Sequence, residues 1–300
     1  GYITKITYHA NDGDDLTETA IGDNNNIYGK LFELDSLGRV TQISYINNEF
    51  NISADKTGVA YIKFKYTLFG DIGSMEILDL NGKPTLNEQK FAKRITTFDN
   101  YGNPIEEWHE GIEGQPCYNN QIIYKVKVSY SDSGFQEEIK YIDFNGNKSF
   151  NSSNYAIKKN ESDAKGRCIK SSYYDMNEEP CFTANNYSIV KFEYNTEDCI
   201  INISFFDIKD EPCADNVLGV HRMHYTYNEH NVLIVQEYYN SKNKPTLSHN
   251  FGIAKQVQVY NNYQQLVSVQ SYNEQDKLCL NTHTFVCEGK FSYDNRGNQT

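Results

Sequence analysis

A short turn phrase recurs along the chain at intervals of 32 or 33 residues. The phrase usually begins with an aromatic residue, followed by Asp, Asn, Ser or Thr. Three residues after that polar residue comes a position, here called the slot, that is most often glycine. The nine slots are Gly38, Gly70, Gly102, Gly134, Gly166, Asp198, Asn231, Gln264 and Gly297. Self-similarity at a fixed period of roughly 20 to 50 residues is the signature of tandem-repeat architectures. The spacing therefore predicts about eight copies of one structural unit.

The residue types in the phrase predict a tight four-residue turn. The polar residue three places before each slot has a short side chain that bonds its own backbone two residues on, as Asp35, Asp99 and Asp294 illustrate. Gly, Asn and Asp adopt a positive φ in the slot at little steric cost. Each phrase is therefore expected to join two antiparallel strands.

Alternation on either side of the turn predicts half-buried strands. Tyr124, Val126, Val128 and Tyr130 alternate with polar residues over 124–130, which is the period-two pattern of a strand. No long stretch has the 3.6-residue period of a helix. The expected fold is all-β, a tandem array of 32- to 33-residue antiparallel β-hairpin repeats that forms an elongated or coiled ribbon or solenoid.

Strand ends carry apolar residues on both faces. Two neighbouring columns that point to opposite faces are largely apolar, as Ile77 and Leu78 or Phe205 and Phe206 illustrate. At least part of the sheet is therefore expected to be covered on both sides.

Five of the six prolines lie 14 residues beyond a glycine slot: Pro84, Pro116, Pro180, Pro212 and Pro245. We expect them in a loop of about ten residues that links the two strands of a unit. Residues 34–300 are then the tandem repeats, and residues 1–33 form a partial or atypical first repeat. Because both ends fall inside a unit and no capping repeat is evident, the chain is expected to be a segment of a longer protein.

Charge and composition narrow the function. Asp and Glu number 40 against 28 Lys and Arg, the formal net charge is −12, and the mean hydropathy is −0.68. Without a basic run we expect no nucleic-acid partner, and without a long apolar run no membrane insertion. Phosphate-loop, dinucleotide and nucleophile-elbow motifs are absent from the sequence, so we expect no enzyme activity, no catalytic residues and no cofactor. An enzymatic site would be sought first at 111–121, beside Trp108 and His109.

Four of the seven cysteines, Cys117, Cys181, Cys213 and Cys279, follow the proline column or its equivalent. Cys181 and Cys213 would be neighbours if successive loops stack, so whether they pair is left open. Thr85 and Thr246 occupy the same column, which favours a small, half-buried side chain over a disulfide or a metal ligand. No metal site is predicted.

The phrases Tyr130-Ser-Asp-Ser-Gly134 and Tyr293-Asp-Asn-Arg-Gly297, with Leu37-Gly-Arg-Val40, resemble the YD repeats of bacterial Rhs and related polymorphic-toxin and cell-wall proteins. The resemblance covers about 34–300 and implies a long β ribbon that coils into a shell or filament, with a structural or binding role in a toxin-associated protein. The unit is longer than the usual YD repeat and has the additional proline phrase. A weaker resemblance is to WG-type repeats, although Trp108 is the sole tryptophan.

The function expected from these features is a non-enzymatic scaffold or binding module of a larger, bacterial protein. Its partners would be another protein or other domains of the same chain, which it would bind or space apart. The alternative is a glycan- or cell-wall-binding module that uses aromatic columns, with Trp108, Tyr141, Tyr173 and Tyr238 as the candidate ligand-facing rings. A bacterial surface or secreted location and a cytoplasmic effector role both stay open.

Overall fold

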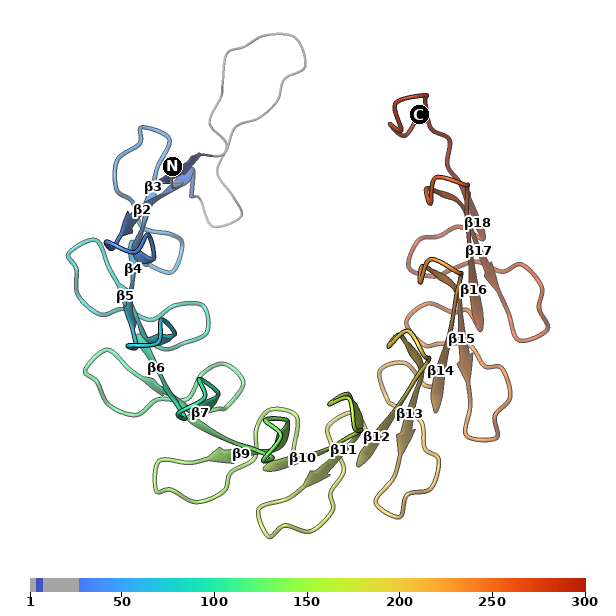
Figure 1. Cartoon of the computed structure of the whole chain (residues 1–300), viewed down its shortest axis with the longest axis horizontal. Coiled ribbons are helices and arrows are strands. Elements are labelled where there is room, and N and C mark those ends of the chain that lie inside the picture. The colour runs from blue at the N-terminus through green and yellow to red at the C-terminus, as the bar shows by residue number, and fades with distance from the viewer. Residues whose placement is uncertain (1–3, 8–26) are drawn as a thin grey trace. The chain divides into compact units, whose positions relative to one another are not determined.

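The computed structural model describes residues 4–7 and 27–300, and within these ranges it is all-β, with 18 strands and no helix (Figure 1). The predicted fold class of tandem antiparallel hairpins is confirmed. No helix in the described part of the chain is long and apolar enough to cross a membrane. The chain divides into two compact units, one of residues 1–130 with 139–152 and one of residues 131–138 with 153–300.

In the first unit each strand pairs antiparallel with the next one along the chain, from β1 to β8. The strands are β1 (Lys5–Thr7), β2 (Gly29–Leu34), β3 (Val40–Ile46), β4 (Tyr61–Tyr66), β5 (Ile72–Leu78), β6 (Lys93–Phe98), β7 (Pro104–Glu110) and β8 (Lys125–Tyr130), and β9 (Gln136–Ile142) is divided between the units. Most of the expected atypical repeat at 1–33 lies outside the described residues.

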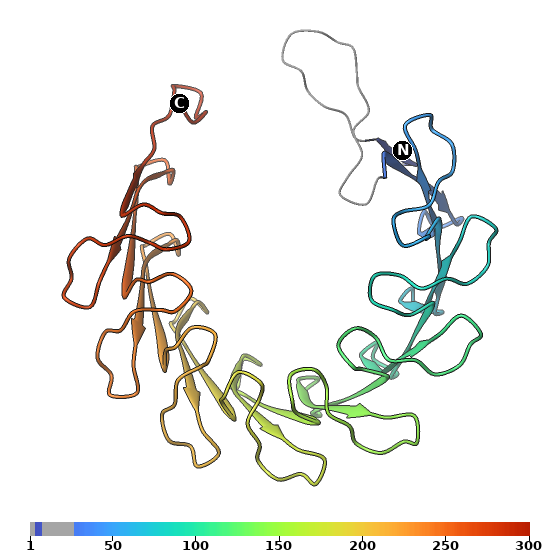
Figure 2. The same ribbon diagram turned by 180° about the vertical axis from the view of Figure 1, so that it is seen from behind.

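The second unit continues the same meander from β10 to β18. Its strands are β10 (Ile157–Ser162), β11 (Cys168–Tyr174), β12 (Ile189–Tyr194), β13 (Ile200–Phe206), β14 (Arg222–Tyr227), β15 (Leu233–Tyr239), β16 (Lys255–Tyr260), β17 (Leu266–Tyr272) and β18 (Glu288–Lys290). Short turns and long loops alternate between successive strands, as Figures 1 and 2 show.

The short turns have the backbone that the sequence predicts. All nine slot residues have a positive φ, from 58° at Asn231 to 98° at Gly70. In the turn at 163–167, the amide of Gly166 donates to the carbonyl of Asp163 over 2.9 Å, and the Asp163 Oδ1 accepts from the amides of Lys165 and Arg167. These bonds satisfy the turn's own polar groups and fix its shape.

The loop between the strands of successive hairpins differs from the expected loop of about ten residues. It is longer, spanning 79–92 between β5 and β6, and it contains two further turns of the same kind. In one repeat these turns begin at Asp175 and Thr183, and their fourth residues, Glu178 and Asn186, have φ values of 68° and 66°. Each repeat therefore has three similar turns, and only one of them was predicted from the sequence.

The extra residue of the 33-residue repeats lies in the third turn. In a 32-residue repeat the amide of Gly58 donates to the carbonyl three residues earlier, at Asp55. In a 33-residue repeat the amide of Gly219 donates to Asp215, four residues earlier. The added residue widens this turn and leaves the strands in register.

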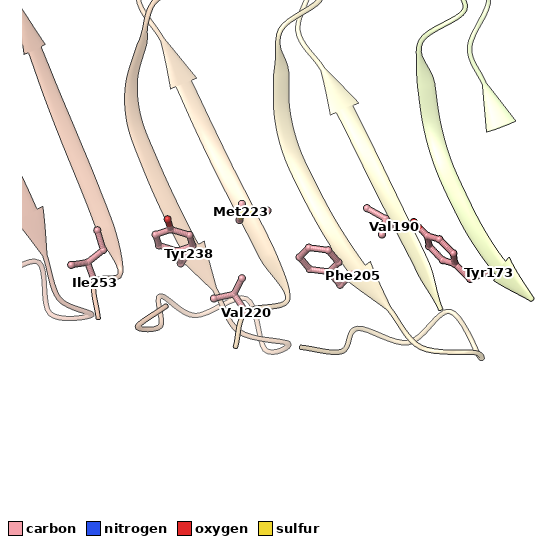
Figure 3. Packing of buried hydrophobic residues seen from close by; sticks show 7 residues of the cluster. All are labelled: Tyr173, Val190, Phe205, Val220, Met223, Tyr238 and Ile253. Atoms are coloured by element: carbon pink, nitrogen blue, oxygen red, sulfur yellow. The ribbon is translucent and has the colours of Figure 1, made fainter. Parts of the chain in front are cut away.

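The core lies where the strands meet the long loops. In the second unit a row of side chains from successive strands and loops forms one cluster (Figure 3): Tyr173, Val190, Phe205, Val220, Met223, Tyr238 and Ile253. In the first unit Ile77 and Leu78, which are adjacent on β5, are 1% and 8% exposed. Burial of both neighbours confirms that this end of the sheet is covered on both faces.

A buried histidine in the second unit makes stability dependent on pH. His221 is 8% exposed, and its Nδ1 lies 2.7 Å from the carbonyl of Phe205. Desolvation lowers the pKa of His221 below its usual value, although backbone hydrogen bonds oppose this shift. The unfolded chain then binds the proton more readily, so this contribution to stability is present above about pH 6.5 and is lost as the pH falls below it.

Replacing His221 with alanine should flatten this pH dependence. Ala60, Ala92, Ala156 and Ala254 occupy the equivalent position in other repeats, so the substitution suits the fold. We expect the melting temperature of the original chain to fall more than that of His221→Ala between pH 7 and pH 5. Equal slopes in thermal unfolding across this range would contradict the assignment.

Candidate ligand-binding grooves

Neighbouring hairpins separate toward their short turns. Within a hairpin six residue pairs are in register, as between β12 and β13, whereas between hairpins only three are, as between β13 and β14. Each of these hairpins also contains a β-bulge near its short turn, where one residue of the outgoing strand has no partner opposite it. In three successive hairpins of the second unit these bulge residues are Ile201, Ile234 and Val267.

Three open grooves occupy these separations, one beside each bulge residue. The first groove contains Ile201, Tyr225 and Tyr227 and has a volume of about 480 Å³. The middle groove, beside Ile234, has about 540 Å³, and the last groove, beside Val267, has about 530 Å³. Because they recur with the hairpins, the grooves present equivalent sites at the edge formed by the short turns.

The aromatic column before each turn forms a wall of each groove. The hydroxyl of Tyr227 donates to the carbonyl of Ile200 over 2.8 Å, and the hydroxyl of Tyr293 donates to Leu266 over 2.9 Å. These bonds hold one hairpin against the previous one. Burial raises the pKa of Tyr227, so its phenol stays protonated as a donor at neutral pH.

The middle groove departs from this pattern. The hydroxyl of Tyr260 donates instead to Oε1 of Gln258 over 2.6 Å, so it does not reach the carbonyl of the preceding hairpin. The groove is lined by Ile234, Val257 and Val259, and Val259 is 44% exposed. It therefore offers the most apolar surface of the three.

Side-chain amides dominate the rims. Asn228, Asn261 and Gln264 line the middle groove, and the Asn228 Nδ2 donates to Gln264 Oε1 over 3.1 Å. In the last groove, hydrogen bonds from Asn298 lower the pKa of Asp294, which keeps this turn carboxylate ionised. The grooves thus combine an apolar floor, an aromatic wall and a rim of side-chain amides with a few charged groups, such as Glu229 and Asp294.

Two of the four aromatic rings predicted to face a ligand belong to the core. Tyr173 is 9% exposed and Tyr238 is 2% exposed, and both lie in the cluster of Figure 3. The prediction of ligand-facing rings is therefore corrected for Tyr173 and Tyr238. Alternation placed both on one face of the sheet, but it did not show that the long loops cover that face.

The other two predicted rings are half-buried. Tyr141 lies on β9, and Trp108 lies on β7 with the Lys125 Nζ 5.0 Å from its ring centroid. The Trp108 Nε1 also donates to Glu110 Oε1 over 3.3 Å. Trp108 is thus held by its own neighbours in the first unit.

The segment 111–121 shows how one repeat compensates for a missing turn residue. Gly111 occupies the position of Asp79 and Asp143 and has no side chain to accept the turn amide. The Gln115 Oε1 accepts the amide of Glu113 over 2.9 Å in its place. His109 is 3% exposed beside this segment, and desolvation lowers its pKa. These contacts account for the irregular residues by folding alone.

All seven cysteines are free thiols, including Cys181 and Cys213. Each of these two points its Sγ at a carbonyl of the preceding repeat, Asn154 at 3.8 Å and Asn186 at 3.6 Å. Burial raises the pKa of both thiols to about 11, so they are protonated and weakly nucleophilic at neutral pH. In the described ranges, no group of three or more His, Cys, Asp or Glu residues is placed to hold a metal ion.

The groove residues Ile201, Ile234 and Val267 were not predicted as site residues, although each lies three residues after the slot of its repeat. Their significance depends on the bulge, which only the strand register reveals.

Neither a known family model nor a curated protein matches this sequence. Among solved structures, a TcdB2-TccC3-TEV chain is similar with 13% identity and a TM-score of 0.42, over 98% of this chain and 16% of that one. A TccC3-mutant Tc holotoxin pore from Photorhabdus luminescens has 13% identity and a TM-score of 0.42, over 90% of this chain and 15% of that one. This chain thus spans about a sixth of the length of these structures, and similarity at this level assigns no function.

Proposed function

We propose that this chain is a repeat scaffold that binds a protein partner along the edge formed by its short turns. The observation that carries the proposal is the row of three equivalent grooves in the second unit, each open to solvent beside an apolar bulge residue. Open concave sites with an apolar floor and a few polar groups are typical ligand sites.

Most other recurring side chains are occupied by the fold itself. The turn aspartates accept backbone amides, and the Lys191 Nζ lies 4.2 Å from the Phe206 ring centroid while it pairs with Asp210. Such contacts recur with the repeat because every hairpin needs them. The grooves also recur with the repeat, but an open groove does not contribute to the folding of a hairpin.

A glycan is the second candidate ligand. The amide-rich rims and the ring of Tyr263, which is 84% exposed beside the last groove, suit sugar hydroxyls and a sugar face. In this second candidate function the glycan binds in the grooves and not on the buried aromatic columns.

Replacing Val259 with lysine tests the site. Lys65 occupies the same position in the first unit, and it faces Ser74 as Val259 faces Ser268. The fold should therefore tolerate the change, while the middle groove gains a charge on its floor. Peptides selected from a random display library on the original chain should bind Val259→Lys at least about tenfold more weakly, a change of about 1.4 kcal/mol.

Thr97→Lys is the matched control, because Thr97 occupies the same column in the first unit. It should leave peptide binding unchanged. A glycan array is screened in parallel with the same three proteins. If oligosaccharides bind in a Val259-dependent way and no peptide does, the protein-partner proposal is rejected in favour of the glycan.

A further inference from the structure

We infer that a second copy of this chain occupies the grooves, with short turns of its first unit seated in the grooves of the second unit. The inference rests on the proposed function, because it takes the ligand of the grooves to be a protein. It goes further by naming that protein and the segment of it that binds.

Three successive short turns of the first unit carry protruding apolar side chains. Arg39 of the first of these turns lies 4.5 Å from the ring centroid of Tyr66, which leads into the second turn. Asp71, which leaves the second turn, lies beside Gly102 of the third. The turns are therefore neighbours, and their side chains form one row, here called the apolar tips. The tips are between 69% and 102% exposed: Leu37, Leu68, Phe69 and Tyr101.

The fold does not need apolar residues at these positions. In the second unit the third residue of each short turn is polar in every repeat but one: Ser133, Lys165, Glu197, His230, Tyr263 and Arg296. The same position in the first unit holds Leu37, Phe69 and Tyr101. Because polar residues are accepted in the same turn, the apolar row indicates a docking surface.

Tips and grooves correspond in number and in period. Three successive turns carry the tips, three successive grooves can receive them, and each series advances by one hairpin. Hairpins follow one another by the same contacts in both units, since six pairs join β4 to β5 and three join β5 to β6. The hydroxyl of Tyr66 donates to the carbonyl of Val40 over 2.7 Å, as that of Tyr227 does to Ile200. Shared contacts thus give the two rows a shared period.

The most apolar tip and the most apolar groove are both in the middle of their rows. The middle turn, 67–70, carries Leu68 and Phe69 and has no charged side chain. The middle groove has the valine floor of Val257 and Val259. Whichever way the two rows run, the middle turn meets the middle groove, and it can enter that groove without burying an ion.

Hydrogen-bonding groups also correspond at the middle turn. In the next turn along, the amide of Tyr101 donates to Asp99 Oδ1 over 2.8 Å. Thr67 has no such carboxylate, and in the described part of the chain the Phe69 amide has no acceptor. Acceptor side chains line the middle groove, among them Glu229 and Asn262. The groove therefore offers an acceptor to the one turn that needs it.

Sedimentation velocity of the full chain between about 1 and 100 µM measures the association. The double variant Leu68→Asn/Phe69→Ser removes the middle tips, and other repeats have Asn100 and Ser133 at these turn positions. It should raise the dissociation constant of self-association at least about tenfold. Val259→Lys should do the same, because it changes the other side of the same contact.

Ile208→Ser is the matched control. Ile208 is 43% exposed on a turn of a long loop, and Ser241 takes its place one repeat later. This variant also loses an exposed apolar side chain, but away from the tips and the grooves. It should leave the association unchanged.

Mixing the two disrupted variants tests whether the contact joins unlike surfaces. The double variant keeps its grooves and Val259→Lys keeps its tips, so an equimolar mixture retains one intact contact. It should form a heterodimer with a dissociation constant close to that of the original chain. A contact between like surfaces is not restored by mixing, because both copies contribute the same patch to it.

A chain that stays monomeric at about 100 µM, association that ignores Val259→Lys, or a mixture that stays monomeric overturns the inference. Binding of the monomeric chain to phosphatidylcholine vesicles through Leu68 and Phe69 also overturns it, and identifies a lipid surface as the occupant of the tips. If the chain is monomeric while library-selected peptides bind in a Val259-dependent way, this inference falls and the protein-partner proposal stands. Val259-dependent binding of oligosaccharides alone overturns both.

Discussion

Replacing Tyr238 with alanine is expected to lower the free energy of unfolding of the second unit by about 3 to 5 kcal/mol. The ring is 2% exposed, lies in the cluster with Phe205 and Met223, and stacks at 6.4 Å on Phe251. Its removal leaves a cavity among side chains that rigid strands hold in place. The hydroxyl, which accepts from Gln236 Nε2 over 2.9 Å, would also be lost.

Tyr263→Ala is the matched control, because this tyrosine is 84% exposed at a turn. It should change stability by no more than about 0.5 kcal/mol. Urea unfolding followed by hydrogen exchange measures both variants, and the loss of protection in Tyr238→Ala should be greatest within 153–300. If Tyr238→Ala is as stable as Tyr263→Ala, the ring is not a core residue and could face a ligand after all.

Replacing Phe91 with alanine should destabilise the first unit by a similar amount, about 3 to 5 kcal/mol. Phe91 is 1% exposed, clusters with Val59 and Ile77, and its ring centroid lies 4.6 Å from that of His109. The cavity would admit water beside His109. Since desolvation is what lowers the pKa of His109, that pKa should rise toward its usual value in the variant.

Proton NMR titration of the His109 ring and urea unfolding measure the two effects. Phe91→Val is the graded control, because Val59 occupies the same position one repeat earlier. It should show a smaller loss of stability and a smaller pKa change than Phe91→Ala. A large loss of stability with an unchanged His109 pKa would show that Phe91 does not shield the imidazole from water.

The repeat and its strands could be predicted from the sequence because they depend on local chemistry. A polar residue three places before a left-handed position specifies a turn wherever it occurs, and Gly166 has the predicted positive φ. The third turn was harder to recognise because the residue type at its left-handed position varies between repeats. It is glycine at Gly58 and Gly219, but Lys90, Ile122 and Phe285 occupy it in other repeats with φ between 58° and 67°, and none of these three residue types signals a turn.

Whether a single side chain is buried or exposed was harder to predict than the fold. Tyr238 and Tyr263 are both tyrosines of the repeats, yet one is 2% exposed and the other 84%. Alternation along a strand assigns a residue to a face, but it does not show whether a loop of the same or a neighbouring repeat covers that face. Cys181 and Cys213 illustrate the same limit, since each points at the preceding repeat and not at the other thiol.

The sequence by itself determined the period, the short turns and the antiparallel hairpins, because these follow from interactions between residues close along the chain. Only the tertiary structure decided where neighbouring hairpins separate and which aromatic rings are buried. Both depend on strand register, which leaves Ile201 as an unpaired bulge within the β12–β13 hairpin and pairs only three residues between β13 and β14. The register between β13 and β14 joins residues 18 to 22 positions apart, and a residue pattern does not encode the geometry of such contacts.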